Sequence, residues 1–136
     1  MKRRDVLISG TALLAGLGSS AIAFDSYKPG LIQSALDAGE VVFVDYGTDW
    51  CPTCARQERI VEELRANNSI YDQNITFIQV DFDVYATHEV STSRNIPRRS
   101  TLLILKGDQE LGRIVAGTAK LEIKALLDIG VKAAQG

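Results

Sequence analysis

The hydrophobic residues of the chain change their spacing between residues 31 and 44. Apolar side chains at 31–36 recur at the spacing of one helix face, and Gly39 ends that segment. The next run, from Val41 to Val44, is apolar at every position. Such a run is typical of a strand that is covered on both faces, as in sheets that contain parallel strands. The pattern therefore predicts a short helix followed by a central strand.

Farther along the chain, helical and strand patterns alternate. The elements predicted after Cys51 are a helix ending near residue 67, a strand at 75–82, a weak helix at 84–93, strands at 101–105 and 110–115, and a helix at 120–131. A tight turn at 106–108 joins the last two strands. This order predicts an α/β fold, in which a central mixed β-sheet of about four to five strands carries helices on both faces.

The first 23 residues have a pattern of their own. A basic start precedes an apolar stretch at 6–17, and small residues lead up to Ala23. This pattern predicts an export signal peptide at residues 1–23 that is cleaved after Ala23. The apolar stretch is shorter than the ~20 residues that span a bilayer, which makes a retained anchor the weaker interpretation. Arg3-Arg4 resembles the twin-arginine export signal, and general secretion is the alternative route.

Length and composition are those of one ordinary globular domain. The chain has 136 residues, of which 46% are hydrophobic and 24% are charged. Its formal net charge is −2, and no basic run follows the first few positions, so we expect no nucleic-acid partner. No repeat or linker divides residues 24–136, which we expect to form one soluble, monomeric domain in the periplasm.

The only two cysteines, Cys51 and Cys54, directly follow the only tryptophan, Trp50. A structural metal site normally needs four Cys or His ligands, and His88 is the only histidine of the chain. His88 lies in a polar segment, where a solvated side chain is the simpler interpretation. We therefore expect no metal site within one chain, and only a site shared between two chains stays open.

The same spacing allows a structural disulfide or a reactive dithiol. Closing a loop of about four residues stabilises a fold by about 2 kcal/mol, against about 3 kcal/mol for fifteen residues, so this pair is a weak structural staple. A cysteine at a helix start meets unpaired backbone N–H groups that favour the thiolate. Pro52 suits the first helical turn, where its missing N–H is not needed. The pair therefore favours a redox-active dithiol, with no cofactor beyond its own disulfide.

Asp45 ends the apolar run that begins at Val41. A carboxyl group removed from water has a raised pKa and can serve as a general base near neutral pH. The alternative is an exposed residue just past the strand end. We predict that Asp45 is a buried carboxyl group that can act as a general base.

The stretch VVFVDYGTDWCPTC (residues 41–54) resembles the thioredoxin superfamily in its strand, acidic residue, tryptophan and Cys-x-x-Cys helix start. TLLILKGDQELGRIVAGT (residues 101–118) is similar to the last hairpin of that family. The resemblance implies a thioredoxin-like fold and the activity of a protein thiol–disulfide oxidoreductase. It also implies that Cys51 attacks the substrate, that Cys54 resolves the product, and that Asp45 assists proton transfer at the second cysteine.

Residues around the dithiol are expected to form the active-site environment and to dock substrates: Trp50, Pro52, Thr53, Arg99, Ser100 and Thr101. The family usually has a cis-proline where this chain has Ser100. Pro97 would take that place only if the loop carried an insertion. Without proline we expect a trans bond at Ser100, because a cis bond there costs ~3 kcal/mol. A second departure is Gln79, which replaces a lysine often found near the buried aspartate.

Together, the export signal and the dithiol predict an exported oxidoreductase, and Asp45 with the thioredoxin-like context favours a reductant. Its expected partners are protein disulfide or dithiol substrates and a membrane electron-relay partner, because an exported reductant must itself be reduced again. Two interpretations from other classes stay open. One is a non-enzymatic binding or chaperone module with a structural disulfide, and the other is a dimeric metal carrier.

Overall fold

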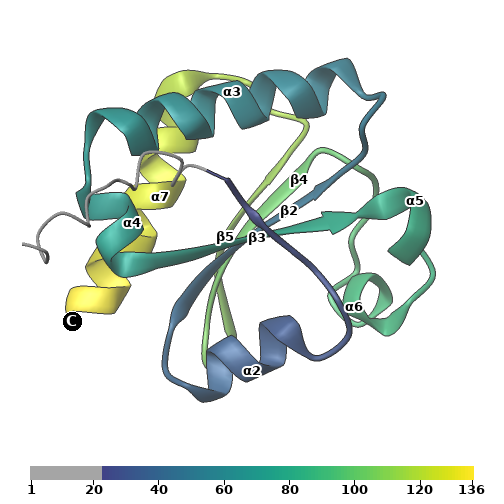
Figure 1. The fold of residues 1–136 in the computed structure, drawn as a ribbon, viewed down its shortest axis with the longest axis horizontal. Coiled ribbons are helices and arrows are strands. Elements are labelled where there is room, and N and C mark those ends of the chain that lie inside the picture. The colour runs from purple at the N-terminus through teal and green to yellow at the C-terminus, as the bar shows by residue number, and fades with distance from the viewer. Residues whose placement is uncertain (1–22) are drawn as a thin grey trace, which may run out of the picture.

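Five strands form one mixed sheet in the order β1-β3-β2-β4-β5 (Figure 1). The computed structural model describes residues 23–136. The strands are β1 (Asp25–Ser26), β2 (Val41–Gly47), β3 (Ile75–Asp81), β4 (Thr101–Lys106) and β5 (Gln109–Val115). β3 runs parallel to both β1 and β2, whereas β4 is antiparallel to β2 and β5 is antiparallel to β4. The mixed sheet predicted from the sequence is confirmed.

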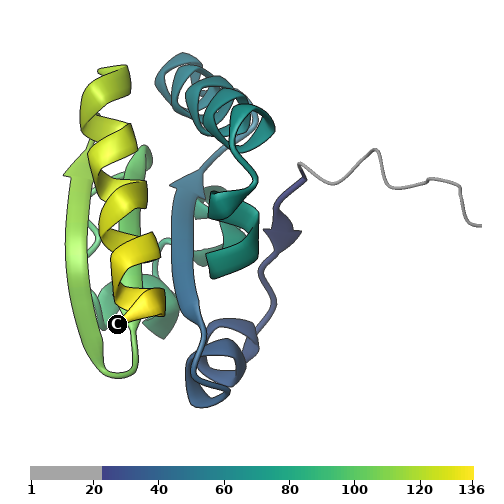
Figure 2. The same cartoon turned by 90° about the vertical axis from the view of Figure 1, so that its left-hand side faces the viewer.

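Helices cover both faces of this sheet. They are α2 (Leu31–Asp37), α3 (Pro52–Asn67), α4 (Ile70–Asn74), α5 (Phe82–Tyr85), α6 (Glu89–Thr92) and α7 (Lys120–Gln135). Helices α3, α4 and α7 pack on one face, and α2, α5 and α6 pack on the other. Figure 2 shows α7 in front of the sheet, with α3 beside it. The central sheet therefore has one hydrophobic core on each side.

Strand β2 forms the centre of both cores. All seven of its residues are buried, because β3 and β4 pair along its two edges while helices cover both faces. Its side chains alternate between the faces. Phe43 packs toward α3 and α7, whereas Val44 and Tyr46 pack toward α2 and α6. This alternation places Asp45 on the face that α3 covers.

Three differences from the predicted elements have simple physical reasons. Strand β2 continues three residues past Val44, since its pairing with β3 extends to Gly47. The weak helix predicted at 84–93 is two short helices, α5 and α6, with a turn between them. The two-residue β1 and the five-residue α4 are too short to produce a periodic pattern.

The predicted export segment at residues 1–23 lies almost entirely outside the described residues, which begin at Ala23. Within residues 23–136, no helix is both long enough and apolar enough to cross a membrane.

Candidate active site

The two cysteines lie at the start of α3, directly after the loop that leaves β2. Cys51 precedes the first helical residue, and its Sγ accepts a hydrogen bond from the backbone N–H of Cys54 at 3.1 Å. Pro52 occupies the first helical position, as its fixed φ favours. Both cysteines are free thiols, and their exposed fractions are only 2% and 4%. The spacing read from the sequence therefore places two buried, reduced sulfurs on one helix end.

Ser100 brings the loop before β4 against both sulfurs. Its Oγ lies 3.3 Å from Cys51 Sγ and 3.1 Å from Cys54 Sγ. Pro97 is exposed in the same loop, whereas Ser100 is buried against both sulfurs, so Ser100 occupies the position that faces the dithiol. No peptide bond among residues 23–136 is cis, which agrees with the trans bond expected at Ser100.

Three hydrogen bonds hold the backbone of Ser100 in a strained conformation. Its φ is +69°, in the left-handed region that residues with a side chain rarely adopt. Its N–H donates to the carbonyl of Tyr46 at 2.7 Å, and its own carbonyl accepts from the N–H of Ala116 at 2.8 Å. Gln57 Nε2 donates to the same carbonyl at 3.1 Å. These hydrogen bonds fix the hydroxyl of Ser100 beside the sulfurs.

The two thiols differ in pKa because they have different surroundings. Burial raises the pKa of Cys51, but hydrogen bonds from Cys54, Ser100 and Arg99 outweigh burial and lower it from 9.0 to about 7. Burial raises the pKa of Cys54, and its interaction with Cys51 raises it further. Cys51 is therefore the thiolate of the pair near neutral pH, and Cys54 keeps its proton.

Asp45 is buried beneath the dithiol, and its carboxyl group stays protonated to a higher pH than usual. Burial raises the pKa of its carboxyl group from 3.8 to about 7, although a hydrogen bond from Gln79 opposes the rise. Gln79 Nε2 donates to Asp45 Oδ2 at 3.3 Å, whereas Asp45 Oδ1 has no hydrogen-bond partner in the protein. The residue is 1% exposed, so the alternative of an exposed position past the strand end is wrong.

Gly47 creates the approach between Asp45 and Cys54. A Cβ atom at Gly47 would lie 3.2 Å from Asp45 Oδ1 and 3.6 Å from Cys54 Sγ. The missing side chain thus leaves a gap that both groups border. A cavity of about 310 Å³ is lined by Gly47, Cys54, Glu58 and Gln79, among other residues. This cavity is large enough for water, which can carry a proton between the carboxylate and the thiol.

Comparisons with known proteins place this geometry in a family. The model of the thioredoxin family matches residues 27–128. The chain belongs to the thioredoxin family. Proteins of this family are thiol–disulfide oxidoreductases that use their own redox-active cysteines without a cofactor.

Two curated thioredoxins are similar to the chain. Thioredoxin H2-1 of Oryza sativa subsp. japonica is 27% identical over 89 residues, which cover 65% of this chain and 59% of that protein. The mitochondrial thioredoxin-2 of Schizosaccharomyces pombe is 28% identical over 88 residues, covering 65% of this chain and 62% of that protein. The chain therefore matches about three fifths of the length of each relative.

Solved structures agree with the family assignment. Trxlp from Edwardsiella tarda superposes with a TM-score of 0.65 at 28% identity, covering 79% of this chain and 98% of that one. Oxidised thioredoxin from Plasmodium falciparum gives a TM-score of 0.64 at 25% identity, covering 82% of this chain and 99% of that one. These likenesses confirm the thioredoxin-like fold over nearly all of the described chain.

Within this thioredoxin-family domain, Trp50 and Arg99 form an exposed edge beside the dithiol. Arg99 Cζ lies 4.3 Å above the centre of the Trp50 ring, and Trp50 Nε1 donates to Asp83 Oδ2 at 2.8 Å. Trp50 is 59% exposed, so one face of this edge is open to solvent. Such a rigid aromatic surface next to Cys51 is suited to contact a polypeptide substrate.

The other predicted environment residues have different positions. Pro52 and Thr53 line a hollow of about 270 Å³ together with Ala116. Thr101 is fully buried, and its Oγ1 donates to the carbonyl of Arg98 at 2.7 Å. Thr101 therefore holds the loop in place and does not face a substrate.

Sequence reasoning missed Gln57 and Gly47 of this thioredoxin-family site. Gln57 is fully buried, and its Nε2 bridges the carbonyls of Ser100 and Gly117, at 3.1 and 2.9 Å. The sequence could have indicated this role, because a glutamine three residues after Cys54 is a polar residue on the buried face of α3. Gly47 gave no such signal, since a glycine near a strand end is ordinary.

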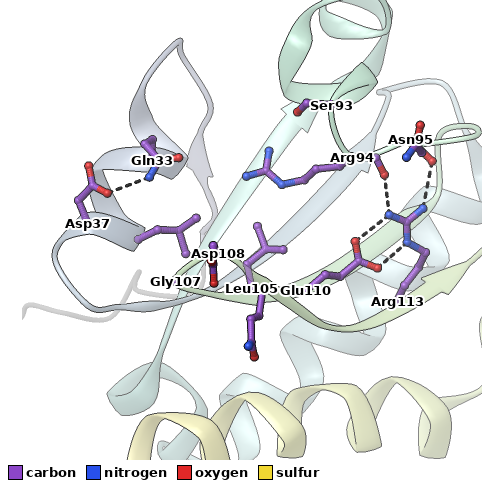
Figure 3. Close-up of a pocket in the computed structure, with 12 residues that line it drawn as sticks. Gln33, Asp37, Ser93, Arg94, Asn95, Leu105, Gly107, Asp108, Glu110 and Arg113 are labelled. Carbon is purple, nitrogen blue, oxygen red and sulfur yellow. Dashed lines mark hydrogen bonds and ion pairs between the residues drawn. The ribbon is translucent and has the colours of Figure 1, made fainter.

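A larger cavity of about 890 Å³ lies at the opposite end of the sheet, near the turn between β4 and β5 (Figure 3). Among the charged residues that line it, Arg113 and Glu110 form an ion pair. Arg113 binds both carboxylate oxygens of Glu110 at 2.8 Å and donates to the carbonyls of Arg94 and Asn95. The thioredoxin-family dithiol is remote from it, because β2 begins beside this turn and ends beside the cysteines.

No group of three or more His, Cys, Asp or Glu side chains within residues 23–136 is arranged to hold a metal ion.

Proposed function

We propose that this chain is an exported protein thiol–disulfide oxidoreductase that acts mainly as a reductant. The observation that carries the proposal is the pair of free thiols at the start of α3, with the pKa of Cys51 lowered to about 7. A nucleophilic cysteine has a pKa of about 7 in thioredoxin and about 3.5 in a strongly oxidising relative. The value at Cys51 therefore supports the reducing direction.

The first step is attack by the Cys51 thiolate on a substrate disulfide. A bond forms between Cys51 Sγ and one substrate sulfur, and the second substrate sulfur leaves as a thiolate that takes up a proton. Trp50 and the hollow beside Ala116 flank Cys51, so they support docking of the substrate on either side. The expected substrates are protein disulfides.

The second step releases the substrate. Cys54 loses its proton through water in the gap at Gly47 to the Asp45 carboxylate. The Cys54 thiolate then attacks Cys51 Sγ, forming the Cys51–Cys54 disulfide and expelling the remaining substrate sulfur as a thiolate, which takes up a proton. The raised pKa of Asp45, about 7, suits a base that must accept a proton near neutral pH.

The proposed location is the periplasm, and its support is the export pattern at residues 1–23. A reductant outside the cytoplasm becomes oxidised in each cycle, so we propose a membrane electron-relay partner that reduces it again. N-terminal sequencing of protein from an osmotic-shock fraction tests both location and processing. A start at Phe24 is expected, whereas recovery of the intact chain in the cytoplasm would contradict export.

A redox titration tests the proposed activity. The purified chain is equilibrated in dithiothreitol or glutathione buffers, and Trp50 fluorescence and thiol content are followed. A reduction potential near −270 mV together with reduction of a protein disulfide is expected. A value near −120 mV would instead make the protein an oxidant, and one below about −300 mV with an unreactive Cys51 would support a binding module with a structural disulfide.

The metal-carrier alternative is tested separately by anaerobic purification and measurement of metal per chain. A metal-free, monomeric and active preparation is expected. A dimer with bound metal on the cysteine pair would replace the enzyme proposal.

A further inference from the structure

Among the described residues, the hydroxyl of Ser100 is the only side-chain oxygen within hydrogen-bond distance of both sulfurs. The Oγ···Sγ distances are 3.3 Å to Cys51 and 3.1 Å to Cys54, within the range for hydrogen bonds to sulfur. Ser100 is fully buried, so solvent does not compete for its hydroxyl. A hydroxyl can donate one hydrogen bond while accepting others, which allows it to serve both sulfurs at once.

We propose that Ser100 is a catalytic residue whose hydroxyl donates its hydrogen bond first to the Cys51 thiolate and then to the Cys54 thiolate as the reaction proceeds. This inference rests on the proposed dithiol function and adds a role that a proline at this position could not perform, because proline has no hydroxyl. The hydroxyl only rotates; it neither gains nor loses a proton overall.

In the resting dithiol, Cys51 carries the negative charge. The Ser100 hydroxyl donates to Cys51 Sγ, and the thiol of Cys54 donates to Ser100 Oγ. A charge-assisted hydrogen bond of this kind is about twice as strong as a neutral one. The arrangement therefore stabilises the attacking thiolate, while burial and the neighbouring Cys51 keep the resolving thiol protonated.

After the first attack, the charge moves to the other sulfur. Cys51 Sγ is then part of a neutral mixed disulfide, and Cys54 becomes the thiolate once its proton has passed to Asp45. Rotation about the Cβ–Oγ bond of Ser100 suffices to redirect the hydroxyl hydrogen, because both sulfurs lie within 3.3 Å of the same oxygen. The same hydroxyl therefore stabilises the nucleophile of each step.

The surroundings of Ser100 explain how it maintains this position. Its φ of +69° is a conformation that glycine adopts more readily than serine. Hydrogen bonds to Tyr46, Ala116 and Gln57 hold it there in spite of the strain. Strain that persists at a reacting centre, held by specific contacts, is the pattern expected of a residue with a role in the chemistry.

The experiment measures thiol pKa values in Ser100→Ala and Ser100→Gly, using thiolate absorbance against pH. Ser100→Gly also removes the hydroxyl but adopts the observed φ without strain, so it guards against loss of folding in Ser100→Ala. Both variants are expected to raise the pKa of Cys51 by about one unit, since hydrogen bonds to charged groups have about this effect. In a Cys51→Ala background, the same two changes are expected to raise the pKa of Cys54.

A second readout follows the two steps directly. Cys51 is converted to a mixed disulfide with thionitrobenzoate, and release of the coloured thiol by Cys54 is timed. Loss of the hydroxyl is expected to slow this release about tenfold at pH 7. It is also expected to make the reduction potential about 30 mV more negative above pH 8.5, which is a tenfold change for two electrons, because the reduced state loses its stabilised thiolate.

Ser91→Ala is the matched control. Ser91 is another buried serine, located in α6, whose hydroxyl has no hydrogen-bond partner in the protein. This variant is expected to leave both thiol pKa values and the release rate unchanged.

Unchanged thiol pKa values in both Ser100 variants would overturn the inference, and a change at Cys51 alone would overturn the transfer of the hydrogen bond to Cys54. Neither result bears on the proposed function, which the redox titration and the cell fractionation test separately. An unreactive wild-type dithiol in the thionitrobenzoate assay would remove both.

Discussion

At one end of the central sheet, where β2 leads into α3, buried polar atoms lack partners and the backbone is strained. Asp45 Oδ1, Thr48 Oγ1, Gln57 Oε1 and Arg99 Nε are buried there without a hydrogen-bond partner in the protein. Ser100 and Ala116, at φ +69° and +66°, face each other across the same region. At the other end, Arg113 pairs with Glu110, and Gln33 pairs with Asp37, around the larger cavity (Figure 3).

The two ends of the sheet differ in this way because the dithiol end serves the reaction, whereas the far end serves stability. Unpaired buried groups and positive φ values destabilise a fold, and at the dithiol end they gather around the reacting sulfurs. Beside the far cavity Asn95 also has a positive φ, of +54°, but asparagine adopts this conformation more readily than serine or alanine. The paired charges of Arg113 and Glu110 near the β4–β5 turn instead hold that loop in place. Substitutions at the dithiol end should therefore change the chemistry, whereas those at the far end should change at most the stability.

The largest effect is expected for Cys54→Ser. Cys51 can still attack a substrate disulfide, but no thiol remains to resolve the product, so the protein accumulates as a covalent complex. Turnover should fall to background, and mass spectrometry after mixing with a disulfide substrate should show one substrate per chain. Multiple turnovers by this variant would contradict the role of Cys54. Arg113→Ala, at the far end, should lose about 1–2 kcal/mol of stability with turnover unchanged.

Asp45→Asn is expected to slow the resolving step about a hundredfold at pH 7, since general acid–base groups contribute on this scale. The rate is measured by release of thionitrobenzoate from Cys51, as for Ser100. Asp37→Asn is the matched control at the far end, where Asp37 is exposed and accepts a hydrogen bond from Gln33. An equal loss of rate in both variants would contradict a specific proton-transfer role.

The same Asp45→Asn variant should also change how stability depends on pH. Folding raises the pKa of Asp45 from 3.8 to about 7, so the folded state holds this proton more tightly than the unfolded state. The free energy of unfolding should therefore fall by up to about 4 kcal/mol as the pH rises from 4 to 7, and then level off. Denaturant titrations of Asp45→Asn should lack this fall and show a more stable protein at pH 8.

Gly47→Ala tests whether the gap beside Asp45 carries the proton. The added Cβ would lie 3.2 Å from Asp45 Oδ1 and 3.6 Å from Cys54 Sγ, so it displaces any water between them. Resolution by Cys54 should slow about tenfold, while the pKa of Cys51 and its first attack stay near the wild-type values. Stopped-flow separation of the two steps provides the internal control. Equal slowing of both steps would indicate a general distortion of the site.

The smallest effect is expected for Arg99→Ala. Arg99 contributes the weakest of the hydrogen-bonding effects that lower the pKa of Cys51, and it covers the Trp50 ring. The pKa of Cys51 should rise by about half a unit, with the attack rate at pH 6 falling about threefold. Arg59→Ala removes the same charge from an exposed position on α3 and should change neither quantity.

Much of the dithiol half of the site could be predicted from the sequence, because its parts are close together along the chain. The buried run before Asp45, the Cys-x-x-Cys spacing and Pro52 each have local causes, and the structure places them as expected. Gln57 and Gly47 were missed for different reasons. The role of Gln57 can be recognised only when the buried face of α3 is known. The role of Gly47 can be recognised only when the groups that a side chain there would touch are known.

By itself, the sequence determined the α/β order, the reactive pair at a helix start and the burial of Asp45, since local periodicity and helix-end chemistry fix these features. Tertiary structure decided how the second half of the site is built. Ser100 lies 49 residues after Cys51 in the chain, yet its hydroxyl rests between the two sulfurs. The antiparallel pairing of β2 with β4 brings it there, because Tyr46, just before the dithiol loop, pairs with Thr101, just after Ser100.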